Sequence, residues 1–429
     1  MTSVLNHQLQ IFKENLEDSS INQITYHPTA ADTIQKGCNQ TRYSIIIKNT
    51  EDWKNLGRAY LTVKYKLVQN DGATALANGA NVALAGSAFC MWERAELLVD
   101  NQVVSSIQHQ QIANLMLTLA SQSDDYYRTN QSVFHKDTGA PNLAAGDAAN
   151  VGYTVKKAIY SDSKFVEAVL PLKEMFGYCS QDKCDRGLRY EILLTKASDA
   201  NMIFQDANGG DASKVYIDDV SVWCPKIVPS IQATQMLENS MNMGQVIRKE
   251  WLGRQAFRSP LLAANDTSIS WRIQNSSVKP RSVFVAFQNS TQINSHTANN
   301  MVFSHQNVNS LFLNVNTDQY PREAYRCDFT PATKTIGRVR RDFEEYNNVF
   351  HDETSGSLVN EIDFASGLYT IFHFDLSNVN PDVMHGDAAD LTLRGTRTGT
   401  NACYIYAVVC GEKEASVSGF GSSLRMELL

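Results

Sequence analysis

The sequence predicts an all-β protein that consists of two tandem eight-stranded jelly rolls, each with a flanking helix and long loops. Short strand-like segments recur along the chain, and long irregular loops separate them. Each half ends in two successive strand-like segments, at 188–195 and 215–225 in the first half and at 391–397 and 403–411 in the second. Only two internal helices are visible, whereas a parallel sheet needs a helix between nearly every pair of strands. Antiparallel sandwiches are therefore expected.

The length of the chain favours two domains. The chain has 429 residues, and a single hydrophobic core stops growing at about 250–300 residues. We expect an N-terminal arm at 1–24, a first jelly roll at 25–228, a linker at 229–250, a second jelly roll at 251–415 and a C-terminal tail at 416–429. The linker is placed where four residues interrupt any periodicity, namely Pro229, Ser230, Asn239 and Asn242.

The N-terminal segment has an apolar stripe at helical spacing, formed by Leu5, Leu9, Phe12 and Leu16. A short helix is marginal in water, so this amphipathic arm is expected to bury its stripe against its own or a neighbouring subunit. Its acidic residues would be repelled by phosphates, which argues against contact with nucleic acid; they are Glu14, Glu17 and Asp18.

In the first half, strands are expected at 41–48, 60–68 and 165–172, and a strand pair at 91–104 turns at Asp100-Asn101. A helix follows this pair, because five apolar residues repeat at helical spacing: Ile107, Ile112, Leu115, Met116 and Leu119.

Two segments of the first half, 70–87 and 136–152, are rich in small residues. Such segments cannot form a core of their own, so both are expected to be surface excursions at one end of the first barrel.

The second half repeats this order. Strands are expected at 267–274, 281–289, 309–315 and 368–376. A helix is expected between the last two of these strands, from the apolar repeat Ile336, Val339, Phe343, Tyr346 and Phe350.

Composition excludes several classes of protein. The net charge is −7, and no run of Lys or Arg reaches the length of a nucleic-acid arm, so direct coating of DNA is disfavoured. No window approaches the roughly eighteen apolar residues of a membrane span, and the polar N-terminus lacks a signal peptide, so synthesis in the cytosol is expected. The eight cysteines are expected to be mostly buried thiols: Cys38, Cys90, Cys179, Cys184, Cys224, Cys327, Cys403 and Cys410. Because no signal peptide is recognised, five glycosylation sequons are interpreted as chance matches, at Asn39, Asn130, Asn265, Asn275 and Asn289.

A resemblance to a known family begins at Tyr320-Pro321-Arg322-Glu323, continues through Tyr325 and Asp328-Phe329, and extends to 367–376. These residues resemble the C-terminal barrel of the double jelly-roll major capsid proteins of Polinton-like elements, adintoviruses and virophages. The resemblance implies that three chains form a pseudo-hexagonal capsomer, and that capsomers tile an icosahedral shell around double-stranded DNA. It also implies a minor penton protein at the vertices.

The same residues have a structural interpretation of their own. Proline cannot donate to a strand ladder, so Tyr320-Pro321 is expected to end a strand. In 368–376, the side chains alternate between two faces, as in a core strand of a sandwich.

Three groups of residues could carry chemistry, and each has a more ordinary interpretation. Cys179 and Cys184 with Asp185 have metal-like spacing, and Cys224 would join them if the two closing strands of the first half pair. Without a second pair of ligands they are expected to be loop thiols. His351-Asp352-Glu353 is expected to be a solvated turn. Three arginines are expected to solvate the outer face of the second helix, with a subunit contact as the alternative: Arg338, Arg340 and Arg341.

No nucleophile elbow, P-loop or zincin motif occurs, so no catalytic, cofactor-binding or metal site and no cofactor are expected. The leading hypothesis is a structural virion protein that binds copies of itself, with membrane contact left open. The second is a tandem β-sandwich carbohydrate-binding or fibre protein, with Tyr126-Tyr127 or Trp251 as its platform. A hydrolase on a β-sandwich is third.

Overall fold

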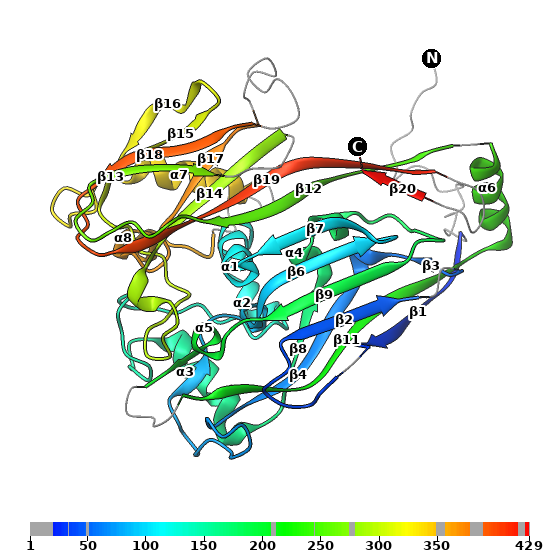
Figure 1. Ribbon diagram of the computed structural model, residues 1–429, viewed down its shortest axis with the longest axis horizontal. Helices are drawn as coiled ribbons and strands as arrows, with labels where there is room; N and C mark the ends of the chain where they lie inside the picture. Colours follow the sequence, from blue (N-terminus) through cyan, green and yellow to red (C-terminus); the bar gives the residue numbers. More distant parts are fainter. Residues whose placement is uncertain are drawn as a thin grey trace, which may run out of the picture.

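The computed structural model describes residues 20–32, 34–48, 51–206, 212–243, 245–273, 279–348, 357–377, 389–418 and 425–428. Within these ranges the chain forms two antiparallel β-sandwiches that pack against each other (Figure 1). The predicted apolar arm and His351-Asp352-Glu353 lie outside the described residues.

The first sandwich has two main sheets. One sheet has the strand order β1 (Ile21–Ala30), β11 (Lys214–Pro229), β4 (Tyr60–Val68) and β8 (Val166–Pro171), with β3 (Trp53–Lys54) also paired to β11. The other has the order β2 (Arg42–Ile47), β9 (Tyr190–Lys196), β6 (Trp92–Val99) and β7 (Gln102–Gln108). Two short strands, β5 (Val82–Leu84) and β10 (Ile203–Gln205), pair separately.

The second sandwich repeats this arrangement. One sheet has the order β12 (Ile247–Arg258), β19 (Cys403–Ser418), β14 (Lys279–Asn289) and β17 (Ile371–Asp375), and β20 (Arg425–Leu428) pairs with β19. The other has the order β13 (Ser268–Ile273), β18 (Leu391–Arg397), β15 (Val308–Val315) and β16 (Asp318–Arg326).

Both sandwiches therefore have one topology. When the main strands of each are counted in chain order, one sheet contains the first, eighth, third and sixth strands and the other the second, seventh, fourth and fifth. This is the jelly-roll order, and it confirms the predicted fold class. The two closing segments of each half are its seventh and eighth strands, and they lie in opposite sheets of their sandwich.

The strands follow from simple patterns. In β4, Leu61, Val63, Tyr65 and Leu67 are fully buried, while the residues between them are polar or partly exposed. The turn between β6 and β7 is made by Asp100 and Asn101, whose φ angles of 49° and 66° are the left-handed values that Asp and Asn tolerate in a tight hairpin.

The structure has more helices than the two expected. They are α1 (Gln110–Ser121), α2 (Tyr126–Thr129), α3 (Val151–Tyr160), α4 (Leu172–Met175), α5 (Asp199–Met202), α6 (Ile231–Asn242), α7 (Gly337–Asn348) and α8 (Glu361–Ser366). Helices α1 and α7 correspond to the predicted pair, although Ile107 belongs to β7 and precedes α1. Helix α3 was missed because its buried face is formed by Tyr153, Lys156 and Tyr160, and a buried lysine breaks an apolar pattern.

Two further expectations were wrong. Residues 82–87 do not lie in a surface excursion, because β5 pairs with β10 and Ala83 and Leu84 are fully buried. Pro321 does not end a strand, since β16 continues to Arg326. The proline is tolerated because β16 is an edge strand, and its pairing with β15 is irregular at this point.

Candidate functional site: the contact between the two sandwiches

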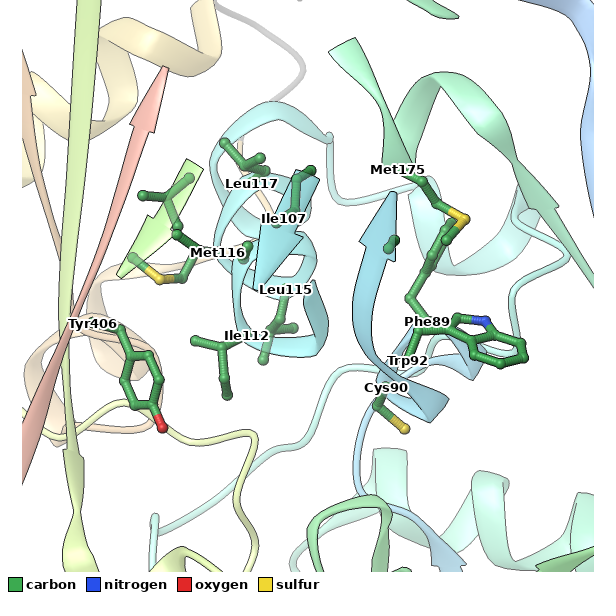
Figure 2. Close-up of a cluster of buried hydrophobic side chains, with 14 of the residues drawn as sticks. Phe89, Cys90, Trp92, Ile107, Ile112, Leu115, Met116, Leu117, Met175 and Tyr406 are labelled. Atoms are coloured by element: carbon green, nitrogen blue, oxygen red, sulfur yellow. The ribbon is translucent and has the colours of Figure 1, made fainter. Parts of the chain in front are cut away.

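Helix α1 lies between the two sandwiches (Figure 1). Its residues from Gln110 to Ala120 are all buried, so the helix is enclosed on every side and not only along the predicted stripe. Figure 2 shows Ile112 and Met116 on the side that faces Tyr406 of β19, while Phe89 and Trp92 of the first sandwich lie beyond its other side. The core is thus continuous from one sandwich to the other.

The C-terminal end of α1 is held by hydrogen bonds that the second sandwich donates to its backbone carbonyl groups. The side-chain amide of Asn347, in α7, donates to the carbonyl oxygens of Ala120 at 3.2 Å and Gln122 at 3.1 Å. The Leu358 amide donates to the Gln122 carbonyl at 3.3 Å. These bonds satisfy the carbonyl groups that a helix leaves unpaired at its C-terminus.

A buried ion pair lies beside this contact. Lys156 Nζ is 3.0 Å from Asp137 Oδ1, and the two side chains are 1% and 2% exposed. Asp137 Oδ2 accepts from Asn299 Nδ2 of the second sandwich at 2.8 Å, and the Asp137 amide donates to the hydroxyl of Tyr369 at 3.0 Å. Both members of this ion pair belong to the first sandwich, and Asp137 joins it to the second through Asn299 and Tyr369.

A second pair anchors the same loop. Lys136 Nζ lies 3.0 Å from Asp363 Oδ2 and donates to the Leu358 carbonyl at 2.7 Å. The segment 136–152, expected as a surface excursion, therefore packs in part against the second sandwich. At Gly152 the absence of a side chain allows the two ends of this segment to approach each other, since a Cβ atom there would overlap the Lys136 carbonyl oxygen.

A third buried pair involves the residues that suggested a metal site. Lys249 of β12 contacts the carboxylate of Asp185, and their side chains are 3% and 5% exposed. Lys249 Nζ also donates to the Tyr178 hydroxyl at 3.0 Å, and the Tyr190 hydroxyl donates to Asp185 Oδ2 at 2.8 Å. Asp185 thus serves as the partner of a lysine from the other sandwich.

The cysteines near this pair are thiols. Burial raises the pKa of Cys179 and raises that of Cys224 to about 12, so both stay protonated at neutral pH. Cys184 is half-buried. Among the residues that the structure describes, no three His, Cys, Asp or Glu side chains are grouped as metal ligands.

A polar cluster lies near the N-terminus of α1. Glu93 accepts from His109 Nδ1 at 2.8 Å and from Gln111 Nε2 at 2.5 Å. Burial opposes ionisation of Glu93, but these hydrogen bonds outweigh it and hold the pKa of Glu93 below its ordinary value. The cavity that these residues line with Arg258 and Tyr406 has a volume of about 20 Å³, far below the roughly 300–1,000 Å³ of small-molecule pockets.

Strand β12 covers the edge of the first sandwich. Arg254 Nη1 donates to the Glu174 carbonyl at 2.7 Å, and Gln181 Nε2 donates to the Glu250 carbonyl. Trp251, one of the aromatic residues considered as a carbohydrate platform, is buried and packs edge-on against Tyr178 at 5.1 Å. A buried ring cannot offer a face to a sugar.

The three arginines of α7 lie away from this contact. Arg340 pairs with Glu344 at 3.3 Å and with Glu361 at 3.5 Å. Arg338 lies over the Tyr325 ring at 5.4 Å. The side chain of Arg341 is exposed. Arg338 and Arg340 therefore bind within the second sandwich.

Sequence reasoning missed the lysines that join the sandwiches. Lys136 and Lys249 gave no signal of their own, because an isolated lysine is usually solvated. In β12, Lys249 is two positions from Trp251 and so lies on the same face of the strand, which could have indicated that it points inward.

The chain was compared with known proteins. Protein-family models and curated proteins gave no match. Among solved structures, a chain of the Sputnik virophage has a TM-score of 0.63 at 11% identity, over 100% of this chain and 93% of that chain. The mavirus major capsid protein has a TM-score of 0.58 at 10% identity, over 100% and 96% of the two chains. The Faustovirus major capsid protein has a TM-score of 0.52 at 8% identity, over 91% and 90%.

At identities this low, the likeness is one of fold. It extends through both sandwiches, because the matches span nearly the whole of each chain. Together with the strand order of the two sandwiches, it shows that the chain has the double jelly-roll fold of viral major capsid proteins.

Proposed function

We propose that the chain is the major capsid protein of a small or element-encoded DNA virus. Three copies form a pseudo-hexagonal capsomer, and capsomers tile an icosahedral shell that encloses double-stranded DNA. Its role is structural and not enzymatic, and it acts by binding copies of itself.

The observation that carries this proposal is the rigid pairing of two sandwiches with one topology. The buried Lys249–Asp185 pair, the hydrogen bond from Asn299 to Asp137 and the enclosed helix α1 fix one barrel relative to the other. A rigid pair of barrels repeated about a threefold axis presents six barrels, which gives a nearly sixfold outline that fills a lattice.

The experiment is a measurement of mass in solution. Light scattering at micromolar concentration is expected to give the mass of a trimer, because capsomer interfaces of obligate size bury roughly 2,000 Å² or more. Electron micrographs of the same sample are expected to show capsomers, sheets or shells. A stable monomer at this concentration would count against the proposal.

Finer features of the proposal are supported by the resemblance described above. They are a minor penton protein at the vertices and a final location in the virion. Synthesis in the host cytosol is proposed from the polar N-terminal sequence. Sequence-specific contact with nucleic acid is not part of the proposal, because the net charge is −7. Within the described ranges, no helix is long and apolar enough to cross a membrane.

We also propose the domain division expected from the sequence, with jelly rolls at 25–228 and 251–415. In the structure, β11 ends at Pro229 and β12 begins at Ile247, inside the expected linker. Helix α6 fills most of the residues between these strands.

The second hypothesis, a carbohydrate-binding or fibre protein, has less support. Trp251 is buried, and the Tyr126 hydroxyl donates to Glu174 Oε2 at 2.8 Å. The solved structures that match include capsid proteins, which favours the first hypothesis.

A further inference from the structure

Helix α6 lies at one end of the molecule, in the connection between β11 and β12 (Figure 1). None of its side chains from Ile231 to Ser240 is buried. Ile231 is 78% exposed, Met236 66% and Leu237 41%. The helix therefore presents apolar side chains to solvent.

The contacts described for α6 are too weak to hold it. Its side chains make one ion pair with the rest of the described chain, from Glu238 Oε1 to Arg186 Nη1 at 3.2 Å, and both partners are substantially exposed. Such an exposed pair contributes about 0–1 kcal/mol. A helix of 12 residues is marginal in water unless one of its faces is packed. Something must cover α6.

The N-terminal segment ends beside this helix. The Ser230 amide donates to the Ser20 carbonyl at 2.8 Å, and Ile21 pairs with Pro229. The chain that precedes residue 20 therefore starts next to Ile231, the first residue of α6.

The sequence of this segment contains an apolar face that could cover the exposed apolar side chains of α6. Residues 5–16 have an apolar stripe at helical spacing, formed by Leu5, Leu9, Phe12 and Leu16. As a helix these twelve residues would span about 18 Å, which is also the length of α6.

We propose that residues 1–19 cover α6 of the same chain, with their apolar stripe packed against the exposed apolar side chains of the helix. Because residue 20 lies beside the start of α6, a stripe that packs along the helix runs antiparallel to it. This direction places each helix N-terminus beside the C-terminus of the other, which their dipoles favour. The proposal is independent of the capsid function.

Hydrogen exchange measured by mass spectrometry tests this contact in the intact protein. Deletion of residues 2–18 is expected to increase the exchange rate of the α6 amides by about tenfold or more, because the helix loses its packing. The amides of α1, which is enclosed by both sandwiches, are expected to exchange as before.

Paired substitutions separate the apolar stripe from the rest of the segment. Leu9→Asp with Phe12→Asp is expected to reproduce the effect of the deletion. His7→Asp with Gln10→Asp, which adds the same number of acids on the opposite side of the predicted helix, is expected to leave α6 protected. Unchanged exchange of α6 after both the deletion and the stripe substitutions would overturn the proposal.

Disulfide trapping identifies which chain is contacted. Phe12→Cys with Met236→Cys is expected to form a bond within one chain on oxidation, seen as a faster monomer band on a non-reducing gel. Phe12→Cys alone is the control. A covalent dimer that requires both cysteines would show that a second copy is the partner, and would contradict packing within one chain.

Discussion

At the scale of the residue, the contact between the sandwiches depends on buried charges. Lys156 with Asp137 and Lys249 with Asp185 are almost completely removed from solvent. A buried ion pair contributes little net stability by itself, because removal of water from two charges offsets their attraction. The value of the Lys249–Asp185 pair lies in specificity, since any arrangement of the sandwiches that separates these two residues leaves a buried charge without compensation.

The Lys249–Asp185 pair gives a first prediction. Lys249→Met is expected to destabilise the protein by about 3–5 kcal/mol, because it leaves the carboxylate of Asp185 buried and unpaired. The double variant Lys249→Met with Asp185→Leu is expected to recover much of this loss. The midpoint of urea unfolding measures both. Lys183→Met, which removes an exposed lysine nearby, is the control and is expected to have little effect.

His373 gives a prediction of pH dependence. Its ring stacks on Phe284 at 4.7 Å and its Nδ1–H donates to the Asp342 carbonyl at 2.9 Å. Burial lowers the pKa of His373 from its ordinary value of 6.5. As the pH falls through that value, the unfolded chain takes up a proton that the folded protein does not, so stability falls.

We therefore expect the thermal midpoint of His373→Asn to depend less on pH than that of the natural protein, over the range from pH 7 down to the lowered pKa. The quantity compared is the slope of the thermal midpoint against pH, because the substitution also changes stability at every pH. His27→Asn, at an exposed histidine, is expected to leave the slope unchanged. Equal slopes for His373→Asn and the natural protein would contradict the assignment.

At the scale of the element, β12 and the turn 177–180 show how closely the sandwiches approach. A Cβ atom on Gly177 would overlap the carbonyl oxygen of Leu252 in β12. The absence of a side chain at Gly177 therefore allows β12 to lie against the first sandwich while it pairs with β19 in the second.

Substitution of this glycine is the prediction at this scale. Gly177→Ala is expected to destabilise the protein by about 1–3 kcal/mol, because β12 must move to admit the methyl group. Gly337→Ala is the matched control, since a Cβ atom at this first position of α7 meets no atom within 4 Å. There alanine is expected to be neutral or to stabilise by up to about 1 kcal/mol. The thermal unfolding midpoints of both variants test the prediction. An equal decrease of the midpoint in Gly177→Ala and Gly337→Ala would contradict it.

At the scale of the whole molecule, the two sandwiches behave as one body. Helix α1 belongs to the first half of the chain, but its burial is completed by Tyr406 and α7 of the second. Separation of the sandwiches would expose this helix and break the Lys136–Asp363 and Lys249–Asp185 ion pairs at once. The proposed capsid function needs this property, because a hinge between the barrels would change the outline of the proposed capsomer.

Calorimetry tests this coupling. We expect a single cooperative unfolding transition for the full chain, because neither sandwich keeps a closed core when the other unfolds. Two well-separated transitions, each with the enthalpy of one half, would show that the sandwiches unfold independently and would contradict the shared core.

The sequence by itself determined most of the strands. These elements depend on the preferences of residues that are neighbours in the sequence. Examples are the alternation in β4, the Asp100-Asn101 turn and the closing strands of each half. The duplicated order of these local signals was enough to indicate two similar barrels. The N-terminal arm, His351-Asp352-Glu353 and the end of the second predicted helix lie outside the described residues.

Only the tertiary structure decided how the two barrels are joined. Asp185 and Lys249 are 64 positions apart in the chain, and Asp137 and Asn299 are 162 apart. No local pattern relates such residues, and a lysine or aspartate has the same preference for solvent wherever it occurs. Their burial becomes favourable only when the fold brings an opposite charge or a hydrogen-bond partner to each, and that partner comes from the other sandwich.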